Sequence, residues 1–256
     1  MTKISYRHLA QVYDRLMQDA PYDEWLNWTE TLWEQIGVQP HTVVDLACGT
    51  GTLTWKLAKT GRTVVGIDRS AEMLAVAAGK RDQWVGSASN VQWLEQDMRE
   101  LSLPNEVDAV VCYCDSLNYL LTEADWQRTF QAVYRALCPG GVFLFDIHSI
   151  HKISHGFGNE LFAWEESGVY CVWHNHFDDT TCMVEQDLTF FVEQPDGRYE
   201  RFDEQHQQRA FPLKTVKQWL EATGFTVHAI TNDFHTDGAA RDTAERLFFA
   251  VQKRVR

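Results

Sequence analysis

The segment from Val43 to Ser70, VVDLACGTGTLTWKLAKTGRTVVGIDRS, constrains the fold of this chain more than any other part. It consists of an apolar run, a knot of small residues, a stretch with helical spacing, a second apolar run and an acid. Two short apolar runs joined by a helix are typical of a βαβ unit in a parallel sheet. The segment therefore predicts an α/β fold, with a site for a nucleotide-like molecule at the first strand–helix turn.

The same alternation continues along the chain. Apolar runs predict strands at 43–46, 63–67, 91–95, 107–113, 142–147, 225–230 and 247–252, and helical spacing predicts helices at 52–59, 70–81, 122–137 and 213–223. Two further amphipathic helices precede the first strand, at 6–17 and 25–36. Such repeats predict a doubly wound, mostly parallel sheet with helices on both faces.

The alternation of strands and helices is interrupted after Ile147. From Trp164 to Gln208 apolar and polar residues alternate, and Asp196-Gly197 marks a hairpin turn. We expect residues 148–206 to form an antiparallel β subdomain inserted into one core, 41–147 with 207–256, and to lie over the carboxyl edge of its sheet. Residues 1–40 are expected to form a helical lid, and the inserted strands a second part of the lid that surrounds the substrate.

Composition excludes several kinds of partner. The 256 residues carry a formal charge of -13 without a basic run, which disfavours binding to nucleic acid and favours a neutral or cationic small molecule. No stretch approaches the roughly 20 apolar residues of a membrane span, and the N-terminus lacks an apolar signal core, so we expect a cytoplasmic protein without a membrane partner. The six cysteines are scattered and indicate neither disulfides nor zinc.

The small residues after the first strand narrow the choice of ligand. A dinucleotide fingerprint needs G-x-G-x-x-G, but Gly49 and Gly51 are followed by Thr54, and a P-loop would need a Gly-Lys-Ser/Thr end, whereas GTGTLT has no lysine. Asp45, four residues before Gly49, would repel a pyrophosphate and suits an ammonium group.

Acids at the next two strand ends indicate the remaining parts of the ligand. Asp68 follows the second strand, where a carboxylate can accept both hydroxyls of a ribose. Asp97 follows the third strand and could accept from an adenine amino group, while the backbone of Met98 pairs with the ring. An amine, a ribose and an adenine together describe S-adenosylmethionine.

Several motifs then support a family resemblance. VVDLACGTG, VVGIDRS, EQDMREL, VVCYCDSLNYL and CPGGVFLFD resemble, in order and spacing, the strand-end motifs of class I S-adenosylmethionine-dependent methyltransferases over residues 41–147. The N-terminal helix and the stretch DLTFFVEQPDGRYERFDEQHQQRAF are similar to those of the bacterial YqeM-type methyltransferases. The resemblance implies a seven-stranded Rossmann-like fold and that cofactor. One departure is Ala47, where many relatives have glycine; we expect a negative φ there, which alanine tolerates.

The expected site residues follow from these motifs. The residues expected to contact the cofactor are Tyr13, Asp45, Ala47, Cys48, Gly49, Gly51, Asp68, Arg69, Met73, Gln96, Asp97, Met98, Cys114, Asp115 and Asn118. The residues expected to contact the substrate are Tyr6, His148, Glu204, His206 and Arg209. His148, His151 and His155 would share a helical face, and His174 with His176 a strand face, but without a suitably spaced anionic ligand we expect no metal.

The expected function is in-line transfer of a methyl group to a small molecule. Because the sulfonium is already activated, the protein mainly aligns the reactants and excludes water. A hydroxyl or acidic carbon would need a base, for which His148, His206 and a nearby carboxylate remain unranked candidates. A non-catalytic S-adenosylmethionine-binding module and an NAD-dependent oxidoreductase remain alternatives, and the acceptor and the oligomeric state stay open.

Overall fold

The computed structural model describes residues 9–84, 86, 88–241 and 243–255. The helices are α1 (Leu9–Leu16), α2 (Tyr22–Ile36), α3 (Thr52–Lys59), α4 (Ala71–Gly79), α5 (Glu123–Ala136) and α6 (Leu213–Thr223), with short turns η1 (Arg81–Gln83), η2 (Ala88–Asn90), η3 (Met98–Glu100), η4 (Ser116–Tyr119) and η5 (Lys152–Phe157). The strands are β1 (Thr42–Leu46), β2 (Thr63–Asp68), β3 (Val91–Glu95), β4 (Val107–Cys112), β5 (Leu137–His148), β6 (Leu161–Glu166), β7 (Val169–Asp178), β8 (Met183–Glu193), β9 (Tyr199–Arg209), β10 (Phe225–Asn232) and β11 (Arg246–Lys253).

The main sheet has seven strands in the order β10-β11-β5-β4-β1-β2-β3. Strands β1 to β5 pair in parallel, whereas β11 runs antiparallel to both of its neighbours. The strand order reverses between β1 and β4, and a ligand of a doubly wound sheet binds at such a switch point. This topology confirms the predicted fold class.

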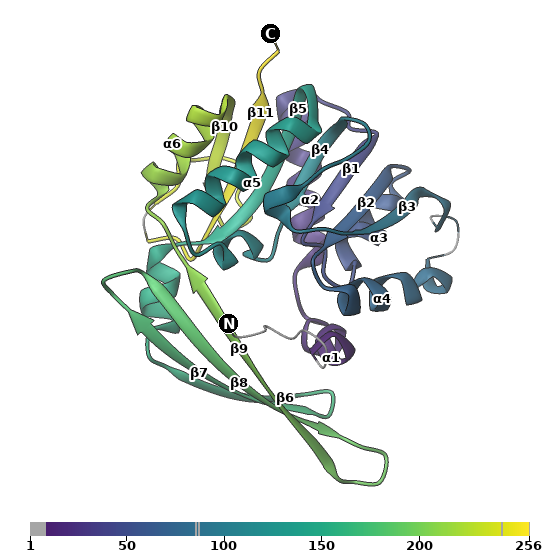
Figure 1. Ribbon diagram of the computed structural model, residues 1–256, viewed down its shortest axis with the longest axis vertical. Helices are drawn as coiled ribbons and strands as arrows, with labels where there is room; N and C mark the ends of the chain where they lie inside the picture. The colour runs from purple at the N-terminus through teal and green to yellow at the C-terminus, as the bar shows by residue number, and fades with distance from the viewer. Residues whose placement is uncertain (1–8, 85, 87, 242, 256) are drawn as a thin grey trace.

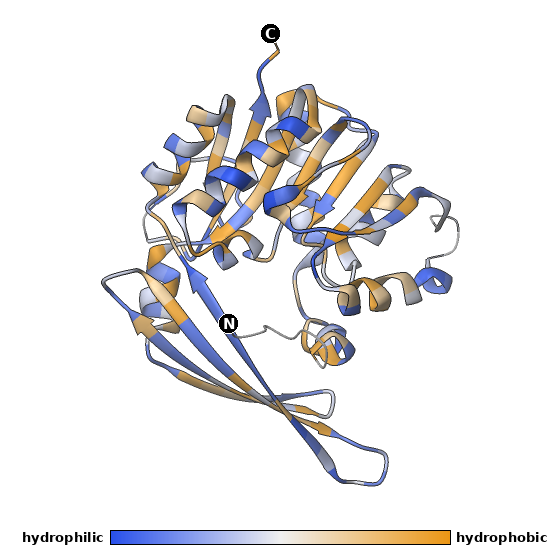
Figure 2. Ribbon diagram, in the orientation of Figure 1, coloured by the Kyte–Doolittle hydropathy of each residue, from blue (hydrophilic) through white to orange (hydrophobic). Residues whose placement is uncertain are grey.

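Two hydrophobic layers hold helices against the two faces of this sheet (Figure 1). Trp126, Phe130 and Val133 of α5 share the apolar face that the sequence predicted, and they pack with α6 on one face of the sheet. The tryptophans of α2 pack on the other face with α3. Figure 2 shows the result, with strands of the main sheet apolar along most of their length and helices apolar on one side only.

Side chains cap the N-terminal ends of two of the predicted helices. The side chain of Ser70 accepts a hydrogen bond from the Met73 N–H, and that of Thr122 accepts one from the Asp125 N–H. One boundary was wrong, because β5 begins at Leu137 and includes the Pro-Gly-Gly stretch expected to lie before the strand. Pairing of Leu137 with Val107 extends the strand backwards, across an irregularity in the β4–β5 register.

A second sheet, here called the lid sheet, consists of β6-β7-β8-β9 in antiparallel order. Together with α1 it lies beyond the carboxyl ends of the parallel strands (Figure 1). Cys171 and Phe190 of the lid sheet pack against Leu9 and Val12 of α1 in a small core of their own. The lid sheet and α1 thus cover the edge where the ligand of this fold binds.

No helix among the described residues is long and apolar enough to cross a membrane. The cytoplasmic location stays a prediction.

Candidate active site

A cavity of about 560 Å³ lies between the carboxyl ends of the parallel strands, α1 and the lid sheet. Most of the residues predicted to contact a cofactor line it: Tyr13, Asp45, Ala47, Cys48, Gly49, Asp68, Arg69, Met73, Gln96, Asp97, Met98, Cys114 and Asp115. His148 and His206, predicted to contact the substrate, line it too. The fold therefore brings together strand-end residues that are far apart in the sequence.

The turn after β1 has an unusual backbone. Ala47, Gly49 and Gly51 all have positive φ, of 58°, 54° and 74°. The prediction of a negative φ at Ala47 was wrong: the turn there adopts the left-handed region, which costs an alanine roughly 1–2 kcal/mol. Gly49 lies against open space, and its N–H donates to Oδ2 of Asp68 at 2.9 Å.

Gly51, which was also predicted to contact the cofactor, is not among the residues that line the cavity. A Cβ added at this position would lie 2.4 Å from Cη2 of Trp93 and 2.9 Å from Cβ of Ala77. Its missing side chain lets the start of α3 approach β3 and α4.

Asp45 is a buried carboxylate at the start of this turn. Only 3% of the residue is exposed, and Oδ2 accepts a 2.5 Å hydrogen bond from the Thr54 hydroxyl. Burial raises the pKa of Asp45 to about 7, although the Thr54 hydrogen bond opposes the shift. A cationic group bound next to it would restore its charged form.

Asp68 and Asp97 lie at the ends of β2 and β3. Oδ2 of Asp68 accepts a hydrogen bond from the Gly49 N–H and Oδ1 accepts one from the Ser70 N–H, both at 2.9 Å. Since an ionised carboxylate has about four lone-pair sites, Asp68 can accept from a hydroxyl donor as well. Burial raises the pKa of Asp68, while the Arg99 hydrogen bonds lower that of Asp97.

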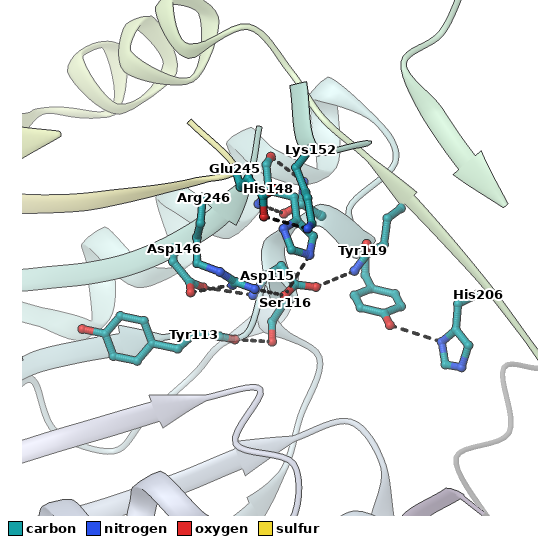
Figure 3. A network of polar contacts seen from close by, with 12 residues as sticks. Tyr113, Asp115, Ser116, Tyr119, Asp146, His148, Lys152, His206, Glu245 and Arg246 are labelled. Carbon is teal, nitrogen blue, oxygen red and sulfur yellow. Dashed lines mark hydrogen bonds and ion pairs between the residues drawn. The ribbon is translucent and has the colours of Figure 1, made fainter. Parts of the chain in front are cut away.

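A cluster of buried charges occupies the other end of the cavity (Figure 3). Arg246 donates to Asp146 at 2.7 Å and to Asp115 at 3.0 Å, and Nε2 of His148 lies 3.2 Å from Oδ1 of Asp115. Burial alone would raise the pKa of Asp115, but His148 and Arg246 outweigh it and lower the pKa well below its ordinary value. Cys114 and Asp115 both have positive φ, so the chain is strained where β4 enters this cluster.

The lid sheet contributes three side chains from alternate positions of β9. Glu204, His206 and Gln208 are all buried, and Gln208 donates to Oδ2 of Asp115 at 2.7 Å. Arg209, which we predicted to contact substrate, lies on the opposite face of β9 and donates to the carbonyls of Thr181 and Leu121. Because the side chains of a strand alternate between faces, Arg209 does not line the cavity, whereas Gln208 beside it does.

Two other predicted residues do not line the cavity. Asn118 is fully buried and donates to the carbonyls of His148 and Arg209, so its amide joins β5 to β9 behind the wall. Glu204 lies behind His206. Tyr6 lies outside the described residues.

The sequence predictions missed several residues that line the cavity, among them Tyr119, Lys152, Trp173, Gln208 and Arg246. Two of them had a readable signal. Gln208 comes two residues after His206, so the two side chains lie on the same face of β9. Arg246 begins an antiparallel strand, which places it opposite His148 at the carboxyl edge of the main sheet. The positions of Tyr119, Lys152 and Trp173 in the cavity wall depend on how the inserted segment packs against the core.

The predicted histidine faces are found only in part. The rings of His151 and His155 lie 4.7 Å apart and those of His174 and His176 lie 4.1 Å apart, but His148 ends β5 and does not share their face. Within the described part of the chain, no three His, Cys, Asp or Glu side chains gather as metal ligands would.

Comparison with known proteins decides the family. Residues 43–141 match the family model described as a methyltransferase domain. The chain is 42% identical to the putative methyltransferase YqeM of Bacillus subtilis (strain 168), over 97% of both chains. It is 40% identical to a putative methyltransferase of Geobacillus sp. (strain WCH70), over 98% of this chain and all of that one.

The chain belongs to the S-adenosylmethionine-dependent methyltransferases of the YqeM type. A crystal structure of an S-adenosylmethionine-dependent methyltransferase from Clostridium acetobutylicum ATCC 824 agrees over the whole fold, with a TM-score of 0.86, 29% identity and coverage of 97% of this chain and 99% of that one. This methyltransferase therefore uses S-adenosylmethionine, as the acids at the strand ends predicted. The family assignment favours methyl transfer over the nicotinamide oxidoreductase that the glycine loop left open.

Proposed function

We propose that this methyltransferase transfers the methyl group of S-adenosylmethionine to a small organic acceptor held between the strand ends and the lid sheet. The observation that carries the proposal is the single cavity that connects the turn after β1 to the inner face of the lid sheet. Its volume of about 560 Å³ is within the range of small-molecule sites. The walls contributed by α1 and the lid sheet leave a shape that suits a small acceptor better than a folded macromolecule.

The cofactor would occupy the half of the cavity next to β1, β2 and β3. Asp45 would hold the ammonium group, Asp68 the ribose hydroxyls, and Asp97 with Met98 the adenine. The residues fit this ligand, because Asp45 is a buried acid that lacks a cationic partner among the described residues, and Asp68 has lone pairs to spare. When bound there, S-adenosylmethionine would supply an activated methyl group.

The acceptor would occupy the half between η4, η5 and the lid sheet. Its walls are aromatic, with Phe157 and Trp173 in contact at 5.2 Å between ring centroids, and Trp164 and Tyr119 also line the space. Gln186, His206 and Gln208 add polar groups on the lid side. This arrangement suits a small molecule with a flat apolar part and at least one polar group.

The lid would exclude water and hold the acceptor in line with the methyl group. Asp14 of α1 accepts a hydrogen bond from Thr50 at 2.6 Å and pairs with Lys80 at 2.5 Å, which joins the helix to the core beside the glycine turn. Orientation and exclusion of water supply much of the acceleration for a reaction whose donor is already activated.

Mass spectrometry of a cell metabolite extract incubated with methyl-labelled S-adenosylmethionine tests this proposal. We expect one labelled small molecule to appear with the wild-type protein, and much less of it with Asp68→Asn. A matched control is Asp82→Asn, which changes an exposed acid outside the cavity. Binding of S-adenosylmethionine without a labelled product in any extract would point to a non-catalytic module, and label only in protein or nucleic acid would exclude a small acceptor.

A further inference from the structure

The cavity has two imidazoles at its acceptor end, and their surroundings differ. His148 contacts Asp115, whose oxygens are also held by Arg246 and Gln208. Nδ1 of His148 is buried without a hydrogen-bond partner, and this atom is not exposed to the cavity. The ring therefore belongs to a network of ion pairs and has no nitrogen available to a bound molecule.

His206 lies in a linear series of three groups. The hydroxyl of Tyr119 lies 3.2 Å from Nδ1 of His206, and Nε2 of the same ring lies 3.4 Å from Oε2 of Glu204 (Figure 3 shows the first contact). Oε1 of Glu204 accepts from the N–H of Leu9 at 3.3 Å. The order is a carboxylate, an imidazole and a hydroxyl, and both His206 and Tyr119 line the cavity.

Burial makes this series unusual for lid residues. The side chains of His206 and Glu204 are only 4% and 3% exposed, and Oε2 of Glu204 has no hydrogen-bond donor among the described residues. Leaving a carboxylate oxygen buried and unpaired is costly, so the imidazole is the group that must stabilise it. The 3.4 Å separation is longer than an ideal hydrogen bond, and such catalytic contacts often shorten only when ligands bind.

The geometry points to a proton relay through Tyr119, His206 and Glu204, in which the Tyr119 hydroxyl contacts the acceptor. The acceptor is then a group that loses a proton on methylation, such as a hydroxyl, an amine, a thiol or an acidic carbon, because only such an acceptor uses the relay. This inference rests on the proposed function and names the chemical class of its substrate. Tyr119 is the catalytic residue, while His206 and Glu204 act through it and are positioning residues.

The relay step balances as follows. The acceptor oxygen or nitrogen forms a bond to the methyl carbon with its lone pair, and the carbon–sulfur bond breaks with its electrons left on sulfur. The acceptor proton passes to the Tyr119 oxygen as the original phenol proton passes to Nδ1 of His206. The carboxylate of Glu204 stabilises the resulting imidazolium and keeps the ring proton on Nε2 beforehand, as an acid does in other carboxylate–histidine pairs.

The groups around His206 favour this direction of proton transfer. Glu204 is the charged group beside it on β9, its register partner on β8 is the neutral Gln186, and η4 contributes Tyr119. On α1, Leu9 contacts Glu204, Asp14 is paired with Lys80, and Tyr13 lines the same cavity. The cations Arg246 and Lys152 pair with Asp115 and Glu245 on the core side.

Nitrogen NMR of histidine-labelled protein bound to S-adenosylhomocysteine tests the relay without turnover. The His206 signal is assigned by its loss in His206→Gln. We expect a neutral ring protonated on Nε2 in the wild type, and loss of that preference in Glu204→Gln. A ring protonated on Nδ1 would overturn the relay, because Nδ1 could then accept no proton from Tyr119.

Turnover of the metabolite extract with methyl-labelled S-adenosylmethionine gives the second test. Tyr119→Phe removes one oxygen and should slow labelled-product formation about 10²-fold, with binding of S-adenosylmethionine unchanged by calorimetry. The wild-type rate should fall with falling pH, because an imidazolium cannot accept the phenol proton, and His206→Gln should lose that dependence. The control is Tyr170→Phe, which removes a hydroxyl from an exposed tyrosine of β7.

The two proposals fail in different ways. If the wild type forms a labelled product and Tyr119→Phe and His206→Gln keep its rate and pH profile, the relay is wrong and the proposed function stands. If no extract gives a product, the proposed function fails, and the NMR result still decides whether the relay exists.

Discussion

The two halves of the cavity are built in different ways. The half next to β1, β2 and β3 consists of strand-end acids and the turn after β1, each set by the residues immediately around it. The half next to β4, β5 and the lid sheet consists of buried charges contributed by segments about a hundred residues apart, such as Asp146 and Arg246. The proposed cofactor half is therefore set by local geometry, whereas the proposed acceptor half depends on how the inserted segment closes.

Replacing Arg246, which belongs to the buried charges of the second half, should have the largest effect on stability. Arg246→Met leaves Asp115 and Asp146 without their shared cation in the protein interior. Breaking a buried pair in this way costs about 3–5 kcal/mol, so urea unfolding should show a free energy of unfolding lower by that amount. Arg128→Met is the control, because it removes an exposed partner of Glu100 and should cost less than about 1 kcal/mol. Equal losses in the two variants would contradict a special role of the buried cluster.

Asp68→Asn should affect the cofactor half and leave the acceptor half intact. The asparagine side chain keeps one acceptor oxygen. Its NH₂ group replaces the other oxygen and faces a backbone N–H that the carboxylate accepts from in the wild type. We expect affinity for S-adenosylmethionine, measured by calorimetry, to fall by roughly 1–3 kcal/mol. An unchanged affinity would remove Asp68 from the proposed ribose contact.

Most of the fold and the cofactor half could be predicted from the sequence. The reason is physical: Asp45, Asp68 and Asp97 lie at or just beyond the carboxyl ends of β1, β2 and β3, and the carboxyl ends of parallel strands meet at one edge. Ala47 was the exception, because its residue type alone does not reveal a positive φ that the turn imposes on it.

The acceptor half could not be predicted to the same degree. Which face of β9 turns inward is decided by its pairing with β8, in which Gln186 is opposite His206 and Leu188 is opposite Glu204. A shift of one residue in that pairing would exchange the faces of Gln208 and Arg209. Tyr119 and His206 are 87 residues apart in the sequence, so no local sequence pattern predicts their contact.

The buried acid of the cofactor half predicts a pH dependence of stability. Asp45 has a pKa raised to about 7 in the folded protein, so between its ordinary value and about 7 the folded form holds a proton that the unfolded form has lost. Its contribution to stability is complete at acid pH and is lost as the pH rises through about 7, by up to about 1.4 kcal/mol per pH unit. Urea unfolding of the ligand-free protein from pH 4.5 to 7.5 should therefore show this slope, and Asp45→Asn should show a smaller one, to which Asp68, whose pKa is also raised, contributes.

Asp115 should change stability with pH in the direction opposite to Asp45 in the same urea-unfolding measurement. Its pKa is lowered, so its contribution is present above its ordinary value and is lost only as the pH falls below it. The two acids thus act in separate pH ranges. A slope near neutral pH that persists unchanged in Asp45→Asn would show that another group carries it.

Ala47→Gly should give the smallest effect and tests whether the turn after β1 is strained before ligands bind. Glycine adopts φ near 58° without the clash that alanine suffers, which should stabilise the folded state by roughly 1–2 kcal/mol. Glycine also gives the unfolded chain more conformational freedom, which lowers the free energy of unfolding by about 0.4–1 kcal/mol. The net expectation is a rise of about 0–1.6 kcal/mol in the free energy of unfolding measured with urea. Ala75→Gly, at an exposed position within α4, should lose about 1 kcal/mol and serves as the matched control. If both changes destabilise equally, the turn does not hold Ala47 in the left-handed region in solution, and the cofactor half is less rigid than its hydrogen bonds indicate.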